Sequence, residues 1–246
     1  MTKWQRLTSL VLGLLLASCV RPLPTTPPVA HTVTITEYPP LDWSANVQYL
    51  RDSGCEGQVP ATCSELLALG CDEAHGPAFY LGGLQPAYPI IECIHATGEA
   101  PDPAYFRQLN GMDTRYRTFV VYQDGTYRYL TQKSAFQALF APVESPEEAL
   151  SFAMALTGLG ARFDLDPNAD VEYLVDAIAE THVEATPEGY RVTLFDHARQ
   201  MGCDTHPFYA VQVLVTPEGQ VQEVERQEIY RGYACFDFEA LTLVED

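Results

Sequence analysis

The clearest alternation of hydrophobic and polar positions lies in residues 118–131, TFVVYQDGTYRYLT. Aromatic and β-branched residues fill both halves of this stretch, which is typical of strands. Asp124 and Gly125 separate the halves, and an Asp-Gly pair favours the two-residue turn of a β-hairpin. The pattern predicts a hairpin here, and the apolar run at residues 90–94 predicts another strand.

The last third of the chain contains the same four residues twice, Thr-Pro-Glu-Gly at 186–189 and again at 216–219. Proline in the second position and glycine in the last are typical of a tight turn. Each copy lies between strand-like runs. We therefore predict two hairpins, which pair residues 181–185 with 190–195 and residues 208–215 with 221–230.

Residues 145–158 carry the signals of one well-bounded helix. Ser145 suits the N-cap, Pro146 the first helical position and Glu148 the third, which together form a capping box. Apolar residues follow at helical spacing as far as Leu156, and Gly158 suits the position where helices end.

Other helix signals are shorter. Asp170 suits an N-cap, so residues 171–179 are predicted to be helical. Short helices are also expected near residues 63–69, 103–109 and 134–140. Residues 52–98 hold four cysteines, many glycines and prolines and little periodicity, which predicts a loop-rich segment held by disulfides.

These elements predict an α+β fold in which antiparallel β-hairpins pack on one or two helices. We expect a signal peptide at residues 1–18, a lipidated cysteine and proline-rich tether at 19–30, a disulfide-rich and loop-rich subdomain at 31–112, and the α+β domain at 113–246. The last part of the chain has a capped helix, then antiparallel hairpins with a Pro-Glu-Gly turn before the final strand. This order resembles the PepSY and cystatin-like small α+β folds. Those families include protease-inhibitory and accessory modules, but a shared fold does not specify a function.

The first eighteen residues have the composition of an export signal. Lys3 and Arg6 are their only charges, and an apolar run follows at residues 10–17. This run is too short to span a bilayer, which takes about 20 apolar residues. It leads into Leu-Ala-Ser-Cys at residues 16–19, which resembles the lipobox of bacterial lipoproteins.

That resemblance implies that Cys19 becomes the lipidated N-terminus of the mature protein. In the family this cysteine receives a diacylglycerol thioether and often a further acyl chain, which anchors durably because a single chain binds a bilayer only marginally. The expected localisation is extracytoplasmic and lipid-anchored to the cell membrane. Val20 follows the cysteine, which in a cell with two membranes resembles the pattern that directs lipoproteins to the outer membrane. Residues 21–30 hold four prolines and predict an extended tether.

Without its signal the chain has 228 residues, of which 12 are basic and 33 acidic, so its net charge is −21. A body this acidic repels phosphate backbones and anionic headgroups. We therefore expect no nucleic-acid partner, and contact with the membrane through the N-terminal lipid alone. The expected partner is a protein or polymer of the cell envelope.

Six cysteines remain besides Cys19, an even number that indicates disulfides in an exported protein. Cys203 lies 15 residues before Glu218 and Cys235 lies 17 residues after it, so the last hairpin brings the two nearly opposite each other. A disulfide needs Cα atoms within about 7 Å, and we predict the bond Cys203–Cys235. The remaining four are expected to pair among themselves, in an order that the sequence leaves open: Cys55, Cys63, Cys71 and Cys93.

Two clusters have side chains that suit metal ions, although no cofactor is expected otherwise. His197, Asp204 and His206 lie close together in the sequence and are ligands suited to zinc. Oxygen-bearing side chains alternate, as at the start of a calcium-binding loop, at Asp164, Asp166, Asn168 and Asp170. That loop requires glycine at its sixth position and glutamate at its twelfth, where this chain has Ala169 and Val175. The alternative is a polar connector in which Asp170 caps a helix.

The sequence contains no Gly-x-Ser-x-Gly elbow, no His-Glu-x-x-His and no phosphate-binding glycine loop. Cys71 and His75 have the chemistry of a nucleophile and its base, but a disulfide at Cys71 is the stronger expectation outside the cytosol. We therefore expect a non-catalytic binding or accessory module of the cell envelope. The alternative is a metal-binding or metal-dependent hydrolytic lipoprotein that uses one of the two clusters.

Overall fold

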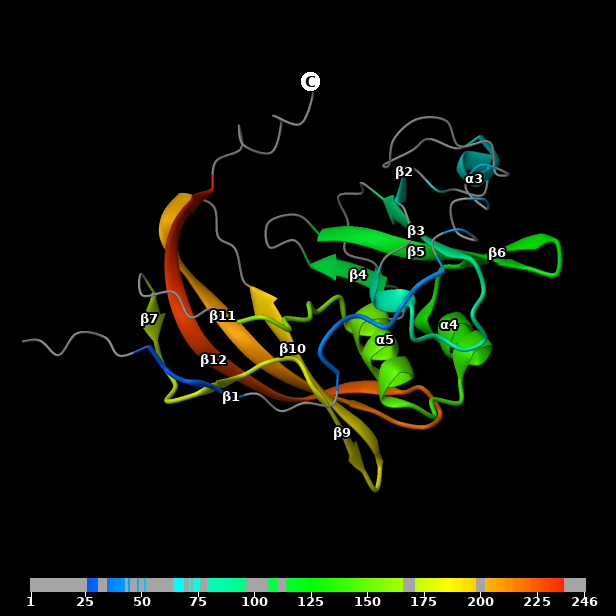
Figure 1. The fold of residues 1–246 in the computed structure, drawn as a ribbon. Helices are drawn as coiled ribbons and strands as arrows, with labels where there is room; N and C mark the ends of the chain where they lie inside the picture. Colours follow the sequence, from blue (N-terminus) through cyan, green and yellow to red (C-terminus); the bar gives the residue numbers. More distant parts are fainter. Residues whose placement is uncertain are drawn as a thin grey trace, which may run out of the picture.

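The computed structural model describes residues 26–30, 35–42, 44, 48, 51, 64–68, 71, 73–75, 79–95, 106–109, 114–165, 171–197 and 202–236. In this part of the chain the fold is mostly β, with two antiparallel sheets and few helices (Figure 1). The predicted fold class is confirmed in part. Antiparallel hairpins and a disulfide are present, but strands take a larger share than an α+β class implies.

The N-terminal sheet has β5 (Thr114–Gln123) at its centre. β3 (Ile90–His95) pairs with β5 and, on its other side, with β2 (Glu73–His75). β4 (Phe106–Leu109) and β6 (Thr126–Leu130) pair with successive parts of β5. The predicted domain boundary at residues 112/113 falls inside this sheet, because β3 and β4 precede it in the chain and β5 follows it.

The predicted hairpin at residues 118–131 is confirmed as β5 and β6. Asp124 and Gly125 connect these strands with φ angles of 52° and 79°. Two successive positive φ angles match the right-handed twist of the flanking strands.

The C-terminal sheet has the order β7-β12-β11-β10-β9. β9 (Val183–Thr186) and β10 (Gly189–His197) form one predicted hairpin, and β11 (Gly202–Val215) and β12 (Val221–Phe236) form the other. Both Thr-Pro-Glu-Gly segments lie at the tips of these hairpins. β7 (Glu172–Tyr173) pairs briefly with β12 at the edge.

The register of β11 with β12 shifts twice, between Phe208 and Tyr209 and between Gln212 and Val213. Each shift gives β12 one extra residue, which bends and twists a strand pair. The two extra residues account for the unequal spacing of Cys203 and Cys235 from the turn, and the register places these cysteines opposite each other. Cys203 is disulfide-bonded, as the prediction requires.

The helices are short. α3 (Ser64–Ala68) and the 3-10 turn η1 (Phe79–Leu81) precede the N-terminal sheet's long strands, and α4 (Lys133–Phe140) and α5 (Pro146–Thr157) lie between the two sheets in the chain. The predicted helices near 63–69, 134–140 and 146–157 are thereby confirmed.

Local signals set both ends of α5. The hydroxyl of Ser145 accepts a hydrogen bond from the backbone N–H of Glu148, and the Glu148 carboxylate accepts from the N–H of Ser145, so the predicted capping box is present. Gly158 ends the helix with φ of 79°, a conformation that only glycine adopts without strain.

α5 lies between the two sheets (Figure 1) and is buried all around from Glu148 to Leu156. Its side chains join one continuous core with residues of both sheets, such as Phe119 of β5 and Val211 of β11. A helix that is apolar on all sides is stable only where it is covered on all sides. Both sheets therefore depend on the same helix.

Arg117 of β5 connects the N-terminal sheet to the C-terminal end of α5. Its Nη2 donates hydrogen bonds of 2.6 Å to the carbonyl oxygens of Met154 and Ala155. The last carbonyls of a helix lack partners within the helix and carry its negative dipole end. A buried cation is well placed to satisfy them.

The charge of Arg117 is paired within the protein. Its Nη1 donates to the Tyr80 hydroxyl at 2.8 Å and to Glu92 Oε1 at 3.1 Å. The Tyr80 hydroxyl in turn donates to Glu92. Burial raises the pKa of Tyr80 well above its ordinary value, Glu92 raises it further, and the charge of Arg117 opposes both. We call Arg117, Glu92 and Tyr80 the arginine cluster.

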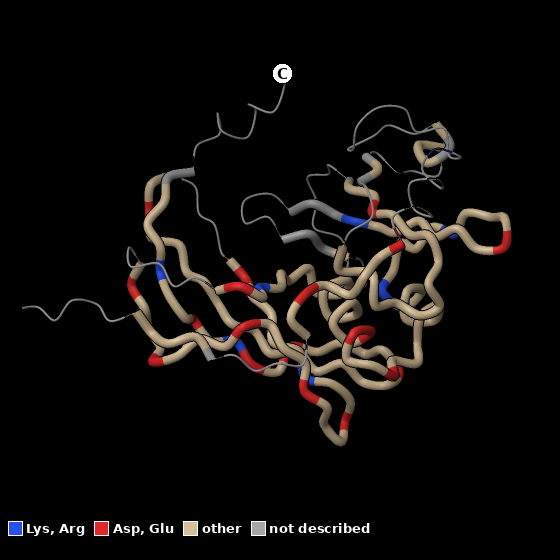
Figure 2. Tube along the Cα trace, in the orientation of Figure 1, with Lys and Arg blue, Asp and Glu red and all other residues tan. Residues whose placement is uncertain are grey.

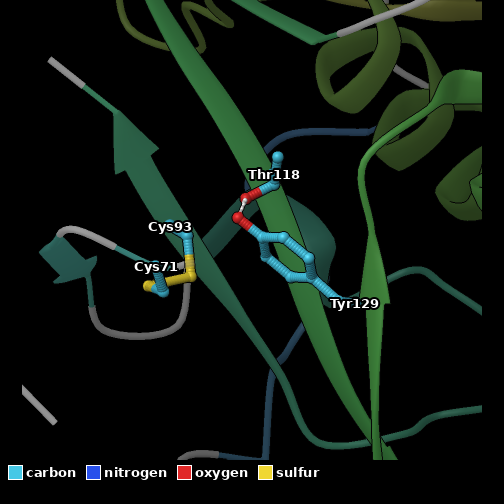
Figure 3. Close-up of a disulfide and its surroundings, with 4 residues drawn as sticks. All are labelled: Cys71, Cys93, Thr118 and Tyr129. Carbon is cyan, nitrogen blue, oxygen red and sulfur yellow. Dashed lines mark hydrogen bonds between the residues drawn. A yellow bond between two sulfur atoms is a disulfide. The ribbon is translucent and has the colours of Figure 1, made fainter. Parts of the chain in front are cut away.

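A disulfide joins Cys71 to Cys93 of β3, with the Cα atoms 5.3 Å apart (Figure 3). It lies in a second, smaller core on the side of the N-terminal sheet that α3 covers. Beside it Thr118 donates a hydrogen bond of 2.9 Å to Tyr129. The predicted pairing among four cysteines is confirmed for these two, and Cys55 and Cys63 lie outside the described residues.

The end of the predicted tether belongs to the folded body. β1 (Val29–Ala30) forms a parallel pair with β8 (Ile178–Ala179), so the extended segment expected to reach residue 30 already joins the body at residue 29. The predicted signal peptide, residues 1–18, and Cys19 lie outside the described residues. In the described part of the chain, no helix has the length and apolar character needed to cross a membrane.

Two predicted helices are strands instead. Residues 106–109 form β4, in which the fully buried Phe106 packs against Phe119 at 4.9 Å. Residues 172–173 and 178–179 form β7 and β8, and Tyr173 contacts Tyr230 at 5.8 Å. β4 pairs with the long strand β5, β7 with the long strand β12 and β8 with β1, and this pairing overrides the weak local preference.

The arginine cluster makes stability depend on pH in a specific way. A raised pKa of Tyr80 in the folded state means that its contribution is fully present below the unfolded pKa, about 10, and is lost as the pH rises from there toward the folded value. We expect Tyr80→Phe to lower the free energy of unfolding by about 1–2 kcal/mol at pH 7. The substitution removes the hydroxyl that accepts a hydrogen bond from Arg117 and donates one to Glu92. This deficit should shrink above pH 10, because phenylalanine has no proton to lose.

Urea unfolding at pH 7, 9 and 10.5 measures the difference between the two proteins. Tyr122→Phe is the matched control, since Tyr122 is 37% exposed and its loss should cost less than about 0.5 kcal/mol. A deficit of Tyr80→Phe that stays constant across the three pH values would show that Tyr80 does not resist ionisation in the fold.

Candidate functional site

The two faces of the C-terminal sheet have different surroundings. Val192 and Val211 face α5 and belong to the main core. Successive side chains of a strand point to opposite faces, so Phe195 and Phe208 lie on the face away from α5. There Ile178 of β8 packs with Phe195 in a small separate core.

A pocket of about 570 Å³ opens on this second face. Side chains of β7, β10, β11 and β12 form its floor. Val29 of β1 and Ile178 of β8 form one wall. Arg162, Asp164 and Leu165 also line the pocket. We call this space the sheet pocket.

A row of four rings crosses the floor of the sheet pocket. His197, Phe208, Tyr230 and Tyr173 come from four adjacent strands, and each is the direct cross-strand partner of the next. The ring centroids lie 3.9 Å, 4.3 Å and 5.8 Å apart along the row. Direct cross-strand aromatic pairs stabilise a sheet, so the row makes a stiff floor.

The stacking decides which part of each ring a ligand can reach. Phe208 has the His197 ring on one face and the Tyr230 ring on the other, at interplanar angles of 10° and 21°. Both of its faces are therefore occupied within the protein. Phe208 offers the pocket its edge, and ring edges carry partial positive charge.

Two oppositely charged side chains lie beside the pocket. Arg162 and Asp164 are both exposed and both line it. Burial raises the pKa of Tyr230, and the charge of Arg162 partly opposes that shift. The Arg162 guanidinium therefore acts on the hydroxyl end of the ring row.

The two histidines of the pocket are already engaged with the protein. His206 is only 1% exposed, and its Nε2 lies 3.1 Å from the carbonyl oxygen of Ala234. That distance suits donation by an Nε2–H to the carbonyl. The His197 ring stacks on Phe208 and stands perpendicular to the His206 ring, with centroids 6.1 Å apart.

The structure brings the predicted zinc ligands together only in part. His197 and His206 share the sheet pocket, but Asp204 is exposed, and its Oδ1 accepts a hydrogen bond from the N–H of Thr205 at 2.7 Å. Among the residues that the structure describes, no three His, Cys, Asp or Glu side chains form a group able to hold a metal ion.

Most of the predicted calcium loop lies outside the described residues. Asp164 is described and lines the sheet pocket, whereas Asp166, Asn168 and Asp170 lie outside the described residues. The proposed nucleophile Cys71 is oxidised in its disulfide with Cys93 and has no thiolate to attack a substrate.

The sequence indicates the two histidines of the pocket but not the ring row, Arg162 or the wall made by Val29. The sequence indicates part of the ring row, because it predicts that Phe208 and Tyr230 lie in the two strands of one hairpin. Their direct pairing depends on both bulges in β12, and no local sequence pattern indicates either of them.

Comparison of the chain with protein-family models, with curated protein sequences and with solved structures gives no significant match. The site is therefore interpreted from its own geometry.

The ring row should contribute to stability through Phe208 in particular. We expect Phe208→Ala to lower the free energy of unfolding by about 2 kcal/mol, because it removes half-buried apolar area and two ring contacts at once. Thermal or urea unfolding measures the change. Phe79→Ala is the matched control, since Phe79 is 56% exposed, and equal losses in the two variants would contradict the role given to the row.

Proposed function

We propose that this protein is a lipid-anchored extracytoplasmic lipoprotein whose body is a non-catalytic binding module of the cell envelope. The observation that carries the binding role is the sheet pocket, with its rigid ring floor, apolar wall and charged mouth. Ligand pockets are typically mostly apolar spaces of roughly 300–1,000 Å³ with a few placed polar groups, and a volume of about 570 Å³ falls in that range.

Binding is favoured over catalysis by the state of the two histidines. A general base needs a ring nitrogen within reach of substrate. His206 is buried and uses Nε2 on the Ala234 carbonyl, and His197 lies stacked in the ring row. The Nε2 atom of His206 is therefore already engaged, and both rings contribute to the lining of the pocket.

An extracytoplasmic location is supported by the disulfide chemistry of the body. The Cys71–Cys93 bond is buried in the small core of the N-terminal sheet, and Cys203 is also disulfide-bonded. Such bonds persist in oxidising compartments and are rare in the cytosol.

The anchor would hold the sheet pocket close to the bilayer. Val29 lines the pocket and lies ten residues after Cys19. An extended chain covers at most about 3.6 Å per residue, so the lipidated cysteine and the pocket wall are at most about 36 Å apart. We expect the ligand to come from the layer of the envelope next to the membrane.

The anchor is tested with Cys19→Ser in the full-length chain expressed in a bacterium. We expect the wild-type protein to enter the detergent phase on Triton X-114 partition and to carry the mass of its acyl groups. Cys19→Ser should stay in the aqueous phase or keep its signal, because serine has no thiol to take the lipid. Ser18→Ala is the control, since it keeps a small residue before the cleavage site. A wild-type protein without the mass of acyl groups, or equal partition of the wild-type protein and a Cys19→Ser chain whose signal has been removed, would contradict the proposed anchor.

A further inference from the structure

The mouth of the sheet pocket has one strong donor and one strong acceptor. Arg162 offers five N–H donors and the carboxylate of Asp164 only accepts. The two residues are exposed, line the same pocket and lie two positions apart. A hydroxyl group both donates and accepts, so neighbouring hydroxyls on one ligand satisfy this pair.

An anionic ligand fits this site poorly. Asp164 lies at the mouth, and the mature chain carries a net charge of −21. Acidic positions are spread over the described body, including the strands of the C-terminal sheet (Figure 2). A single Arg162 does not reverse such a field.

A cationic ligand fits poorly for a different reason. Sites for organic cations place the charge over open aromatic faces. Here Phe208 has a ring stacked on each side, and Tyr230 has one face on Phe208. The floor presents ring edges, whose partial positive charge repels a cation, and Arg162 adds a full positive charge.

The remaining surface of the pocket is mostly apolar, with some hydroxyl groups among the apolar side chains. Val29, Val171 and Ile178 supply aliphatic contacts, and the tyrosines of the ring row can supply hydroxyl groups. A molecule with C–H surface on one side and hydroxyls on the other matches this arrangement. A purely apolar chain would make no use of the polar groups at the mouth.

We propose that the sheet pocket binds a neutral, hydroxyl-rich ring of the sugar class, as one or two units of an envelope polysaccharide. Arg162 donates to ligand hydroxyls and Asp164 accepts from them, while Val29 and Ile178 contact the C–H surface. This inference rests on the proposed function and gives its binding module a ligand class.

The test uses the mature chain with Cys19→Ser, made in an oxidising compartment and followed by ¹H–¹⁵N NMR. Two neutral disaccharides are titrated, cellobiose and N,N′-diacetylchitobiose, beside inorganic phosphate and choline as charged probes. We expect at least one disaccharide to shift signals of the ring row with millimolar affinity, and the charged probes to leave them unchanged.

Variants then identify the recognising groups. Arg162→Ala and Asp164→Asn should each weaken disaccharide binding about tenfold, the loss expected for a hydrogen bond to a charged group. Arg191→Ala and Glu188→Gln are the controls, because Arg191 of β10 and Glu188 of the β9–β10 turn are exposed and do not line the pocket. Neither control should change the affinity.

Each other outcome has a distinct meaning. Binding of phosphate or choline that depends on Arg162 or Asp164 would overturn the sugar class and leave the binding module intact. Disaccharide binding that neither mouth variant weakens would overturn the proposed recognition. If no probe shifts the pocket signals, the sugar class fails. If Cys19→Ser also partitions like the wild-type protein, the anchor of the proposed function fails separately.

Discussion

The structure depends on the burial of α5 between two antiparallel sheets. Burial on all sides requires that both ends of the helix be satisfied inside the protein. Ser145 and Glu148 satisfy the first turn through a capping box, and Arg117 satisfies the carbonyls of Met154 and Ala155 at the other end. Arg117 belongs to the N-terminal sheet, and α5 packs on the C-terminal sheet. These hydrogen bonds therefore connect the two sheets through the helix. A charge buried in this way is tolerated because Glu92 and Tyr80 pair with it.

The face of the C-terminal sheet that α5 leaves uncovered carries the sheet pocket. Bulges in β12 bend this sheet and change its register, so that Phe208 meets Tyr230 directly across the strands. The same register places Cys203 opposite Cys235. β1, the last piece of the predicted tether, pairs with β8 and contributes Val29 to the pocket wall. The proposed anchor at Cys19 precedes this pocket residue by ten positions in the sequence.

Features set by local chemistry were predictable from the sequence. The cap of α5, the turn at Asp124 and Gly125, and both Thr-Pro-Glu-Gly hairpins need only neighbouring residues. Features that depend on pairing between distant parts of the chain were not predictable from the sequence. Residues 171–179 have apolar side chains at helical spacing, yet Tyr173 joins β12 because its ring meets Tyr230. The ring row needs four strands in register, so the sequence alone predicts a metal ligand at His197, whereas in the structure this ring stacks on Phe208.

Native mass spectrometry of the mature protein, extracted from the membranes of the cells that export it, tests the central claim most directly. The claim is that a lipid on Cys19 anchors a metal-free, disulfide-bonded binding module. We predict the mass of residues 19–246 plus a diacylglyceryl group, with or without a further acyl chain, lowered by about 6 Da for three disulfides, with no metal retained. A chain that lacks acyl groups, or that holds one metal ion per molecule, would contradict the account.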